Sequence, residues 1–489
     1  MPAAPKPRRS PSVAGATAAL VLLTALNFVN YIDRYIIFGV QEQVKAEFHV
    51  TDTALGSLTL WFFFTYMFAA PATGWLGDRF PRKPLIVGCA LLISGVNVFT
   101  GLVHSFDSLL LRHAVLGIGE ASLGIFAPAL LADFYPEDDR NRILTIFYTA
   151  IPVGAALGYL IGEIVGSHFG WRMPFYVSAV PGLLIAALIF FYMREPSRGA
   201  TDIKAVKATQ SVRQFGRILS SQGRHSSFFY MGLGVAMLAL AIAGILARTG
   251  GHRPALYLCG AGEIIIATIT VFLLKRDGVG TKVFELATNA PYLYATLGMA
   301  MVTFSLGGIS AWMPSFLQRS GFSASTVGLT LGGITAGAGL GGTAFGGWVA
   351  QRWLRTNHRA LYLLSAWSAL LTVPFGVLCF FGPRATMLPT LGLAMFCIFL
   401  GTGPLNAAIV NAVPAAVRAT AIAFELFLIH ALGDTPSPRL IGMVSDHLGL
   451  ATGLGLTLVT MLIAAVLLFV GARTAPMHEL PPGAPIAGK

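Results

Sequence analysis

Apolar residues fill windows of about 20 positions along almost the whole 489-residue chain, and short polar segments separate these windows. A helix of about 20 apolar residues crosses a hydrocarbon core roughly 30 Å thick. The windows show little alternation of apolar and polar positions, which favours helices over the strands of a membrane barrel. Fourteen membrane-spanning helices are expected, at 17–40, 55–77, 84–104, 109–133, 143–166, 173–193, 228–247, 255–274, 291–317, 327–350, 361–381, 387–413, 417–438 and 451–472.

Composition strengthens this prediction of an all-α integral membrane protein. Hydrophobic residues make up 55% of the chain and charged residues only 11%, whereas soluble domains carry roughly 25% charge. The 55 Gly and 27 Pro suit helices that pack closely and bend. The four cysteines lie in apolar stretches without metal-ligand spacing, so we expect them to pack and predict neither a metal nor a cofactor.

The net charge of +12 is explained by topology. If the N-terminus is inside and the spans alternate, 24 of the 33 Lys and Arg residues face the cytoplasm, seven face outside, and Arg34 and Arg112 lie within helices. The positive-inside rule accounts for this bias, so we predict cytoplasmic termini, at 1–16 and 473–489, in a plasma (inner) membrane and no nucleic-acid partner. The first apolar run lacks a small-residue cleavage site and is expected to remain as a helix.

Two pairs of similar segments indicate an internal repeat. "GWLGDRFPRK" at 74–83 corresponds to "GGWVAQRWLR" at 346–355, and "YPEDDR" at 135–140 to "VPAAVR" at 413–418, so the offsets are 346 − 74 = 272 and 413 − 135 = 278 residues. We predict two six-helix halves with a substrate site between them near the bilayer midplane. The predicted organisation is an N-terminal half at 17–193, a cytoplasmic linker at 194–227, an extra hairpin with its return loop at 228–283, and a C-terminal half at 284–472.

The segment "GWLGDRFPRK" resembles the signature of the major facilitator superfamily between helices 2 and 3, although Pro81 stands where many members carry a small residue. Asp78 can cap a helix end and pair with an arginine of its half, while Arg79, Arg82 and Lys83 lie at the inner leaflet. Plain positive-inside charge is the simpler explanation for Arg82 and Lys83. The gating candidates are Asp78, Arg79, Arg82, Arg140, Arg142 and Asp434.

Four further stretches resemble the Spinster branch of that superfamily. They are "NYIDRY", "RHAVLGIGEASLGIFAPALLADFYPEDDRNR", "FYTAIPVGAALGYLIG" and "LGDTPSPRLIGMVSDHLG", which begin at residues 30, 112, 147 and 432. The resemblance covers roughly 20–198 and 284–472, and it implies a major facilitator fold and export of sphingosine-phosphate or lysophospholipids. The family normally has twelve helices, so the segment at about 200–283 departs from its pattern. We expect the extra pair to be a peripheral hairpin, unless a segment is wrongly counted.

Charged residues within the first predicted helix are candidates for function because each costs about 2.5 to 3.5 kcal/mol to insert. Asn27, Asn30 and Arg34 fall on one stripe of a helix, and Asp33 lies about 100° around the axis from Arg34. The two adjacent charges therefore point in different directions. We predict that Arg34 faces a central cavity and that Asp33 addresses a neighbouring helix or a proton route.

The fourth predicted helix repeats this chemistry with Arg112 and Glu120. Low dielectric favours the neutral form of a carboxyl group, which suits it to load and release a proton. Arginine stays charged, and its planar fork bonds a phosphate in bidentate fashion. We predict Asp33 and Glu120 as proton carriers and Arg34, Arg112 and Asn30 as substrate ligands; the alternative is that these charges only hold two helices together.

The eleventh predicted helix carries a second set of polar residues. His430 and Asp434 are one turn apart and form either a structural pair or part of a proton relay, and His430 is a further substrate-binding candidate. Glu425 is a packing or gate residue. "GDTPSP" is expected to break this helix, and Gly154, Gly158 and Gly162 form a stripe that permits close packing or sliding of helix 5.

No enzyme motif stands out, since a Walker-type phosphate loop, a His/Cys metal set and a soluble nucleotide domain are all missing from the sequence. The repeat and the Gly/Pro-rich helices favour alternating access over a channel, and charges on two helices argue against a receptor. We predict a monomeric, proton-coupled secondary transporter of amphipathic lipids that interacts with anionic substrate, protons and membrane lipids. The alternative is a proton-linked carrier of small organic anions or drugs.

Overall fold

The computed structural model describes residues 13–197, 200, 286, 288–413 and 418–475, and every regular element among them is helical. The N-terminal half contains α1 (Ala16–Gly39), α2 (Gln41–Phe48), α3 (Asp52–Arg79), α4 (Arg82–Thr100), α5 (Phe106–Phe134), α6 (Glu137–Tyr148), α7 (Ala150–Phe169) and α8 (Met173–Tyr192). The C-terminal half contains α13 (Ala290–Arg319), α14 (Ala324–Leu354), α15 (Ala360–Phe381), α16 (Arg384–Asn411), α17 (Arg418–Ile429), the π-helical turn η2 (His430–Asp434), α18 (Ser437–Leu448) and α19 (Leu450–Thr474).

These elements make twelve crossings, six in each half, and confirm the predicted all-α membrane fold. Within the described ranges, nine helices are long and apolar enough to span a membrane on their own. The other three crossings are α3, α14 and the broken helix formed by α17, η2 and α18, which pack among the nine. The expected spans at 228–247 and 255–274, most of the expected linker, and most of both terminal tails lie outside the described residues.

The two halves pack their helices in the same pattern, which is the structural form of the repeat. In the N-terminal half α3 pairs with α5, and α4 and α1 each pair with α8; in the C-terminal half α14 pairs with α16, and α15 and α13 each pair with α19. The halves meet where α7 packs against α14 and α3 packs against α18. These two junctions are equivalent under exchange of the halves.

Two crossings are interrupted at places where glycine or proline disturbs the backbone. The fifth crossing changes from α6 to α7 at Thr149, three residues before Pro152, which lacks a donor for a helical hydrogen bond. The eleventh crossing bends through η2, where Gly433 adopts φ −100° and ψ −105°, outside the helical region. The predicted break at "GDTPSP" therefore lies in a π-helical turn, a feature that is frequent at functional sites.

The predicted glycine stripe of α7 faces α1, within the same half. A Cβ at Gly154 or Gly158 would lie 2.7 or 2.6 Å from the Cβ of Tyr31 or Tyr35, and one at Gly162 would lie 2.7 Å from a backbone carbonyl of α1. Real side chains do not approach so closely, so these positions require glycine for the observed packing. The stripe holds α1 and α7 together as one body.

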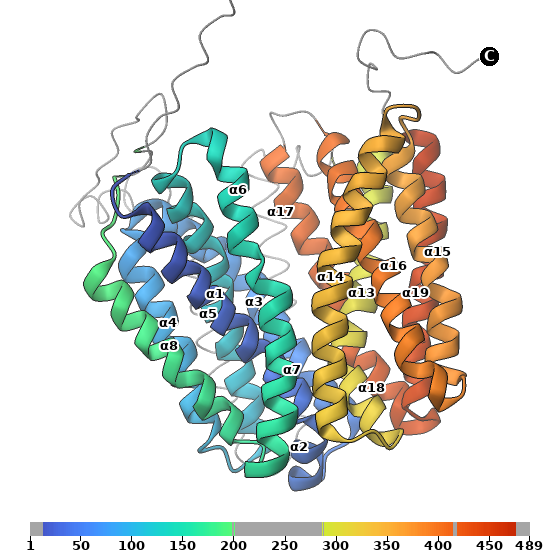
Figure 1. Cartoon of the computed structure of the whole chain (residues 1–489), viewed down its shortest axis with the longest axis horizontal. Coiled ribbons are helices and arrows are strands. Elements are labelled where there is room, and N and C mark those ends of the chain that lie inside the picture. Colours follow the sequence, from blue (N-terminus) through green and yellow to red (C-terminus); the bar gives the residue numbers. More distant parts are fainter. Residues whose placement is uncertain (1–12, 198–199, 201–285, 287, 414–417, 476–489) are drawn as a thin grey trace, which may run out of the picture.

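The ribbons of the two halves converge at one end of the bundle and diverge at the other (Figure 1). They converge where α2, α18 and the adjoining ends of α7 and α14 lie, and diverge toward the end that carries α6, α17 and the last turn of α19. We call the first end the latch face and the second the terminal face. Polar contacts between the halves gather toward the latch face, as described below.

Candidate functional site

Arg34 on α1 and Glu120 on α5 form a buried ion pair inside the N-terminal half. The Arg34 Nε donates to Glu120 Oε2 at 2.6 Å, and a guanidinium Nη makes a second contact with the same oxygen. The Glu120 side chain is inaccessible, whereas 17% of the Arg34 side chain remains exposed. Gly117 allows the close approach of α3 to α5, since a Cβ there would lie 2.3 Å from the Phe62 carbonyl oxygen. The arginine is thus the accessible member of the pair.

Aromatic rings surround the Arg34 guanidinium. Its central carbon lies 4.8 Å from the centroid of Tyr31, 5.0 Å from Phe62, 5.6 Å from Tyr66 and 5.9 Å from Phe63. A cation over the face of a ring is attracted by the ring quadrupole, and the same rings supply apolar contact area. The site joins one permanent positive charge to a wall suited to hydrocarbon.

Asp33 lies apart from this pair, as the helical geometry of α1 predicted. It is 1% exposed, and Asn97, Ser178 and Arg112 are polar neighbours, yet neither carboxyl oxygen meets hydrogen-bonding geometry with a described residue. Burying an ionised carboxylate without such bonds is expensive, which favours the neutral form in this arrangement. Its assignment as a proton carrier stays a prediction.

Arg112 is buried between helices of the N-terminal half and does not join Arg34. Only 2% of it is exposed; its Nη2 donates to Asn97 Oδ1 and its Nε to Thr100 Oγ1, both at 2.5 Å, and the guanidinium lies 4.8 Å from the Phe175 ring centroid. Both hydrogen bonds go to α4, and the side chain is buried, so an anion has no access to the Arg112 guanidinium in this structure. Its role as a substrate ligand stays a prediction that requires a rearrangement.

His430 and Asp434 form the predicted one-turn pair within η2. The His430 Nδ1 lies 2.9 Å from Asp434 Oδ1, and the imidazole stacks on Phe63 at 5.3 Å between centroids and 22° between planes. Its ring also lies 5.5 Å from that of Tyr66. Phe63 and Tyr66 therefore lie between Arg34 of one half and His430 of the other, and connect the two predicted binding residues across the interface.

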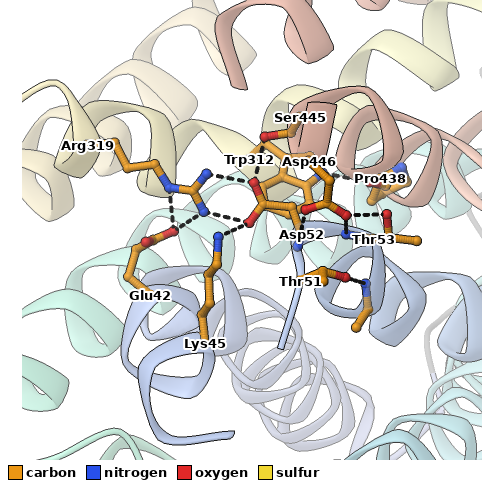
Figure 2. Close-up of polar contacts among 11 residues, drawn as sticks. Glu42, Lys45, Thr51, Asp52, Thr53, Trp312, Arg319, Pro438, Ser445 and Asp446 are labelled. Atoms are coloured by element: carbon orange, nitrogen blue, oxygen red, sulfur yellow. Dashed lines mark hydrogen bonds and ion pairs between the residues drawn. The ribbon is translucent and has the colours of Figure 1, made fainter. Parts of the chain in front are cut away.

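A second polar cluster joins the halves at the latch face (Figure 2). Arg319 on α13 donates to both carboxylate oxygens of Asp52, at 2.7 and 2.8 Å, and also to Glu42. Asp52 also accepts from Lys45 and from Ser445 of α18, each at 2.5 Å. We call Glu42, Lys45, Asp52, Arg319, Ser445 and Asp446 the charged latch. It ties α2 and α3 of one half to α13 and α18 of the other.

Asp446 completes the charged latch by capping α3 from the opposite half. Its oxygens accept the backbone N–H groups of Asp52 at 2.8 Å and Thr53 at 3.0 Å, and Thr51 caps the same helix from its own side. The first N–H groups of a helix lack internal partners and carry partial positive charge, so a carboxylate there is stabilised. The backbone N–H groups of Asp52 and Thr53 therefore have their Asp446 partner only when the halves are together at this face.

Hydrogen bonding lowers the pKa of Asp52, which lies at the end of α3 beyond the expected span at 55–77. Burial by itself would raise the pKa of this carboxyl, but the bonds from Arg319, Lys45 and Ser445 together hold it well below its ordinary range. Asp52 is therefore ionised at any physiological pH. The charged latch is held by permanent charges.

The terminal face holds the remaining predicted gating residues. Arg82 pairs with Asp133 of α5 and donates to the carbonyl oxygens of Gly77 and Ala129, and Arg140 donates to those of Ala132 and Tyr135. These contacts remain within the N-terminal half. Arg142 is exposed, and the side chains of Asp78 and Arg79 lie outside the described part of the structure.

The sequence analysis did not identify the charged latch, because its residues lie at helix ends. Charged residues are common in the loops between predicted spans, so these residues did not stand out. The available signal was Thr51 and Asp52 before an apolar run, which marks a helix start but not its partners. Among the described residues, no group of three or more His, Cys, Asp or Glu side chains gathers where it could hold a metal ion.

The sequence of this chain is similar to a family of known membrane proteins along most of its length. The family model described as Major Facilitator Superfamily matches residues 23–223. The mouse "Protein spinster homolog 1" is 31% identical over 456 residues, which are 88% of this chain and 74% of that protein. The zebrafish "Sphingosine-1-phosphate transporter SPNS2" is 30% identical over 465 residues, or 90% and 77% of the two chains.

Solved structures agree on the fold. A bacterial homologue of the human lysosomal transporter Spinster, in an inward-facing and unoccupied conformation, superposes with a TM-score of 0.70 at 20% identity and covers 95% of this chain and 98% of its own. A peptide transporter, POT, gives a TM-score of 0.68 at 18% identity over 94% and 95%. At such identities the likeness concerns the arrangement of helices alone.

Proposed function

The chain belongs to the Spinster family of the major facilitator superfamily, and from this premise we propose that it moves an amphipathic lipid with an anionic headgroup by proton-coupled alternating access. It is a multi-pass membrane transporter and not an enzyme. The zebrafish relative is named for transport of sphingosine-1-phosphate, which supports a lipid substrate for this chain. A lysophospholipid or a sphingoid phosphate combines the required charge with a hydrocarbon chain.

The observation that carries the proposal is the environment of Arg34. Its guanidinium is partly exposed, is held by the single carboxylate of Glu120, and is lined by aromatic rings. A phosphate headgroup bonds a guanidinium in the same fork geometry as a carboxylate, so substrate and Glu120 compete for Arg34. The rings beside it contact the first apolar part of the substrate.

This competition supplies the proton coupling. When a headgroup takes Arg34, Glu120 is left buried without its cation, and an unpaired buried carboxylate is strongly destabilised. Glu120 then takes up a proton, so headgroup and proton bind together and each strengthens the other. Asp33, also buried, is the second proton carrier, and His430 and Asn30 contact the substrate from the two sides of the site. Arg112 becomes a ligand only after its bonds to α4 break.

The two faces act as alternating gates. The charged latch closes one face in this conformation, and the terminal face is the cytoplasmic one by the distribution of Lys and Arg. In the opposite conformation the latch separates and the terminal face closes, where Asp78, Arg79, Arg82, Arg140 and Arg142 are the gating candidates. Asp434 acts at the bend of η2.

Transport into proteoliposomes tests the proposal. Uptake of a radiolabelled lysophospholipid, with and without a pH gradient, is compared with uptake of a small carboxylate. We expect the lysolipid to be carried and the gradient to accelerate it, because proton and headgroup bind together. Uptake of the carboxylate alone would favour the carrier of small organic anions and refute the lipid assignment.

Binding measurements isolate the role of the ion pair. Lysophospholipid affinity is expected to rise as pH falls, by up to about tenfold per pH unit for one coupled proton, and Glu120→Gln is expected to bind with an affinity that no longer depends on pH. Glu47→Gln is the matched control, since Glu47 is an acid of the same half that bonds Trp171 and Arg172, whereas Arg34 bonds Glu120. Lipid transport that survives both Asp33→Asn and Glu120→Gln unchanged contradicts the proton-carrier roles.

A further inference from the structure

Glu163 on α7 is a buried carboxyl group at the junction of the two halves, and the transport scheme above does not use it. It is 1% exposed. Its two carboxyl oxygens lie 2.7 and 2.8 Å from Nε2 of Gln318, which belongs to α13 of the opposite half. The amide is a neutral partner, so this contact across the interface leaves any charge on Glu163 uncompensated.

Glycines seal the surroundings of Glu163. A Cβ at Gly39 of α1 would lie 2.9 Å from the Glu163 backbone nitrogen, and a Cβ at Gly328 of α14 would lie 3.1 Å from the Glu163 Cβ. One turn away, the Tyr159 hydroxyl donates to the Ser310 carbonyl oxygen of the opposite half at 2.8 Å. Backbone of α1 and α14 thus packs directly against the main chain and Cβ of Glu163, and the side chain is withdrawn from water while the latch face is closed.

The charged groups nearest to this seal do not neutralise Glu163. Glu42 of α2 has the same sign and is already bonded to Arg319, and Arg319 directs its remaining donors to Asp52. α1 and α14 approach Glu163 through Gly39 and Gly328. Among the described residues, no Lys, Arg or His forms an ion pair with Glu163.

Removing an ionised carboxylate from water without a cation costs several kcal/mol even after relaxation of the protein, whereas a neutral carboxyl bonded to an amide carries no such cost. We infer that closure of the latch face takes up a proton at Glu163 and that opening of this face releases it. The two halves close over a neutral Glu163–Gln318 pair and separate to expose an ionised Glu163. This site lies at the gate itself and is distinct from Asp33 and Glu120.

The inference rests on the alternating-access part of the proposed function and adds a proton-linked gate to it. Acid on the latch-face side protonates Glu163 and favours closure of that face. Because Asp52 stays ionised, the charged latch supplies strength without pH dependence, while Glu163 supplies the pH dependence. Gate closure and headgroup binding then respond to protons at separate residues.

Distances across the latch face test the inference in the full-length chain in lipid nanodiscs. Spin labels are placed at Ala46→Cys on α2 and Ser325→Cys on α14, both exposed and on opposite halves, after the four native cysteines are replaced by serine. Distance distributions are recorded from about pH 5 to about pH 8.5, a range in which a carboxyl with a strongly perturbed environment titrates. The closed-to-open ratio is expected to rise as pH falls, by up to about tenfold per pH unit.

Two variants at the gate have definite expected outcomes. Glu163→Gln keeps the shape and removes the proton, and Gln318→Arg supplies a cation to the ionised carboxylate, so each should remain closed across the range and lose the pH dependence. Glu120→Gln is the matched control and should retain it, which separates this gate from the proposed transport coupling. If Glu163→Gln folds and keeps the parent pH dependence, or if the parent shows none, the inference is wrong, whatever the transport assays give.

Discussion

Loss of the Asp52 charge is expected to open the latch face. Asp52→Asn preserves the volume of the side chain but removes the charge that Arg319 and Lys45 contact, and it leaves the Arg319 guanidinium with Glu42 alone. It also replaces an acceptor of four donor contacts by an amide that accepts at one oxygen. Three of these four contacts, two from Arg319 and one from Ser445, come from the opposite half. The substitution therefore destabilises mainly the closed conformation, in which these contacts exist.

The magnitude follows from the burial of the partners. Removing one member of a buried ion pair costs about 3–5 kcal/mol. Here the Asp52 side chain is 2% exposed, but those of Lys45 and Arg319 are 32% and 29% exposed, so solvent screens part of the interaction. We expect about 2 kcal/mol against the closed conformation, which corresponds to about a 30-fold change in the ratio of closed to open molecules.

The labels at Ala46→Cys and Ser325→Cys measure this ratio directly. Asp52→Asn is expected to increase the population with a long distance between them, and thermal unfolding shows whether the variant remains folded. Glu47→Gln is the matched control, because Glu47 lies on the same face but pairs with Trp171 and Arg172 of its own half. An unchanged distribution in folded Asp52→Asn, or an equal change in Glu47→Gln, refutes the view that the charged latch holds the halves together.

Three further predictions concern the same structure. Because the pKa of Asp52 is lowered, this residue stabilises the closed latch face at every pH above the ordinary aspartate pKa, and it loses this contribution only as pH falls through the lowered pKa. In Glu163→Gln molecules the distance between the two spin labels should therefore stay constant between about pH 5 and about pH 8. Gly56→Val should force the latch face open, since a Cβ at Gly56 would lie 2.4 Å from the Pro438 carbonyl oxygen, whereas Gly88→Val, where nothing lies within 4 Å, should leave the same label distances unchanged. Arg34→Lys should weaken lysophospholipid binding by about tenfold or more, because a lysine ammonium has no planar fork for a phosphate; an affinity within twofold of the parent, measured by the same binding assay, contradicts the headgroup role of Arg34.

The twelve described crossings follow closely from local sequence properties. The apolar windows predicted the order and approximate position of these crossings. The breaks at Thr149 and in η2 lie beside prolines and glycines of the sequence. The boundaries differed most in the eleventh crossing, expected at 417–438. It continues as far as Leu448 because η2 bends the helix and lets α18 extend along α3. Hydropathy alone does not detect that continuation, since α18 is amphipathic and contacts the opposite half.

The residues of the candidate site are chosen from the sequence, but their pairings are not. Insertion cost identified Asp33, Arg34 and Glu120, and the angle between neighbouring helical positions separated Asp33 from Arg34. The same reasoning grouped Arg112 with Arg34, although Arg112 is enclosed by Asn97 and Thr100. Which face of α5 meets which neighbour depends on helix packing, and no local pattern determines it.

The sequence by itself determined the class of the protein, because crossing a membrane is a property of each segment: about 20 apolar residues suffice, wherever they lie in the chain. It also placed a few ionisable side chains, Arg34 and Glu120 among them, within predicted spans. Only the tertiary structure decided their partners. Arg34 meets Glu120 across 86 residues of chain, Asp52 meets Arg319 across 267 and Ser445 across 393, and Glu163 meets Gln318 across 155. Charge, burial and protonation at these sites depend on how two halves close on each other, and that is a property of the packed molecule.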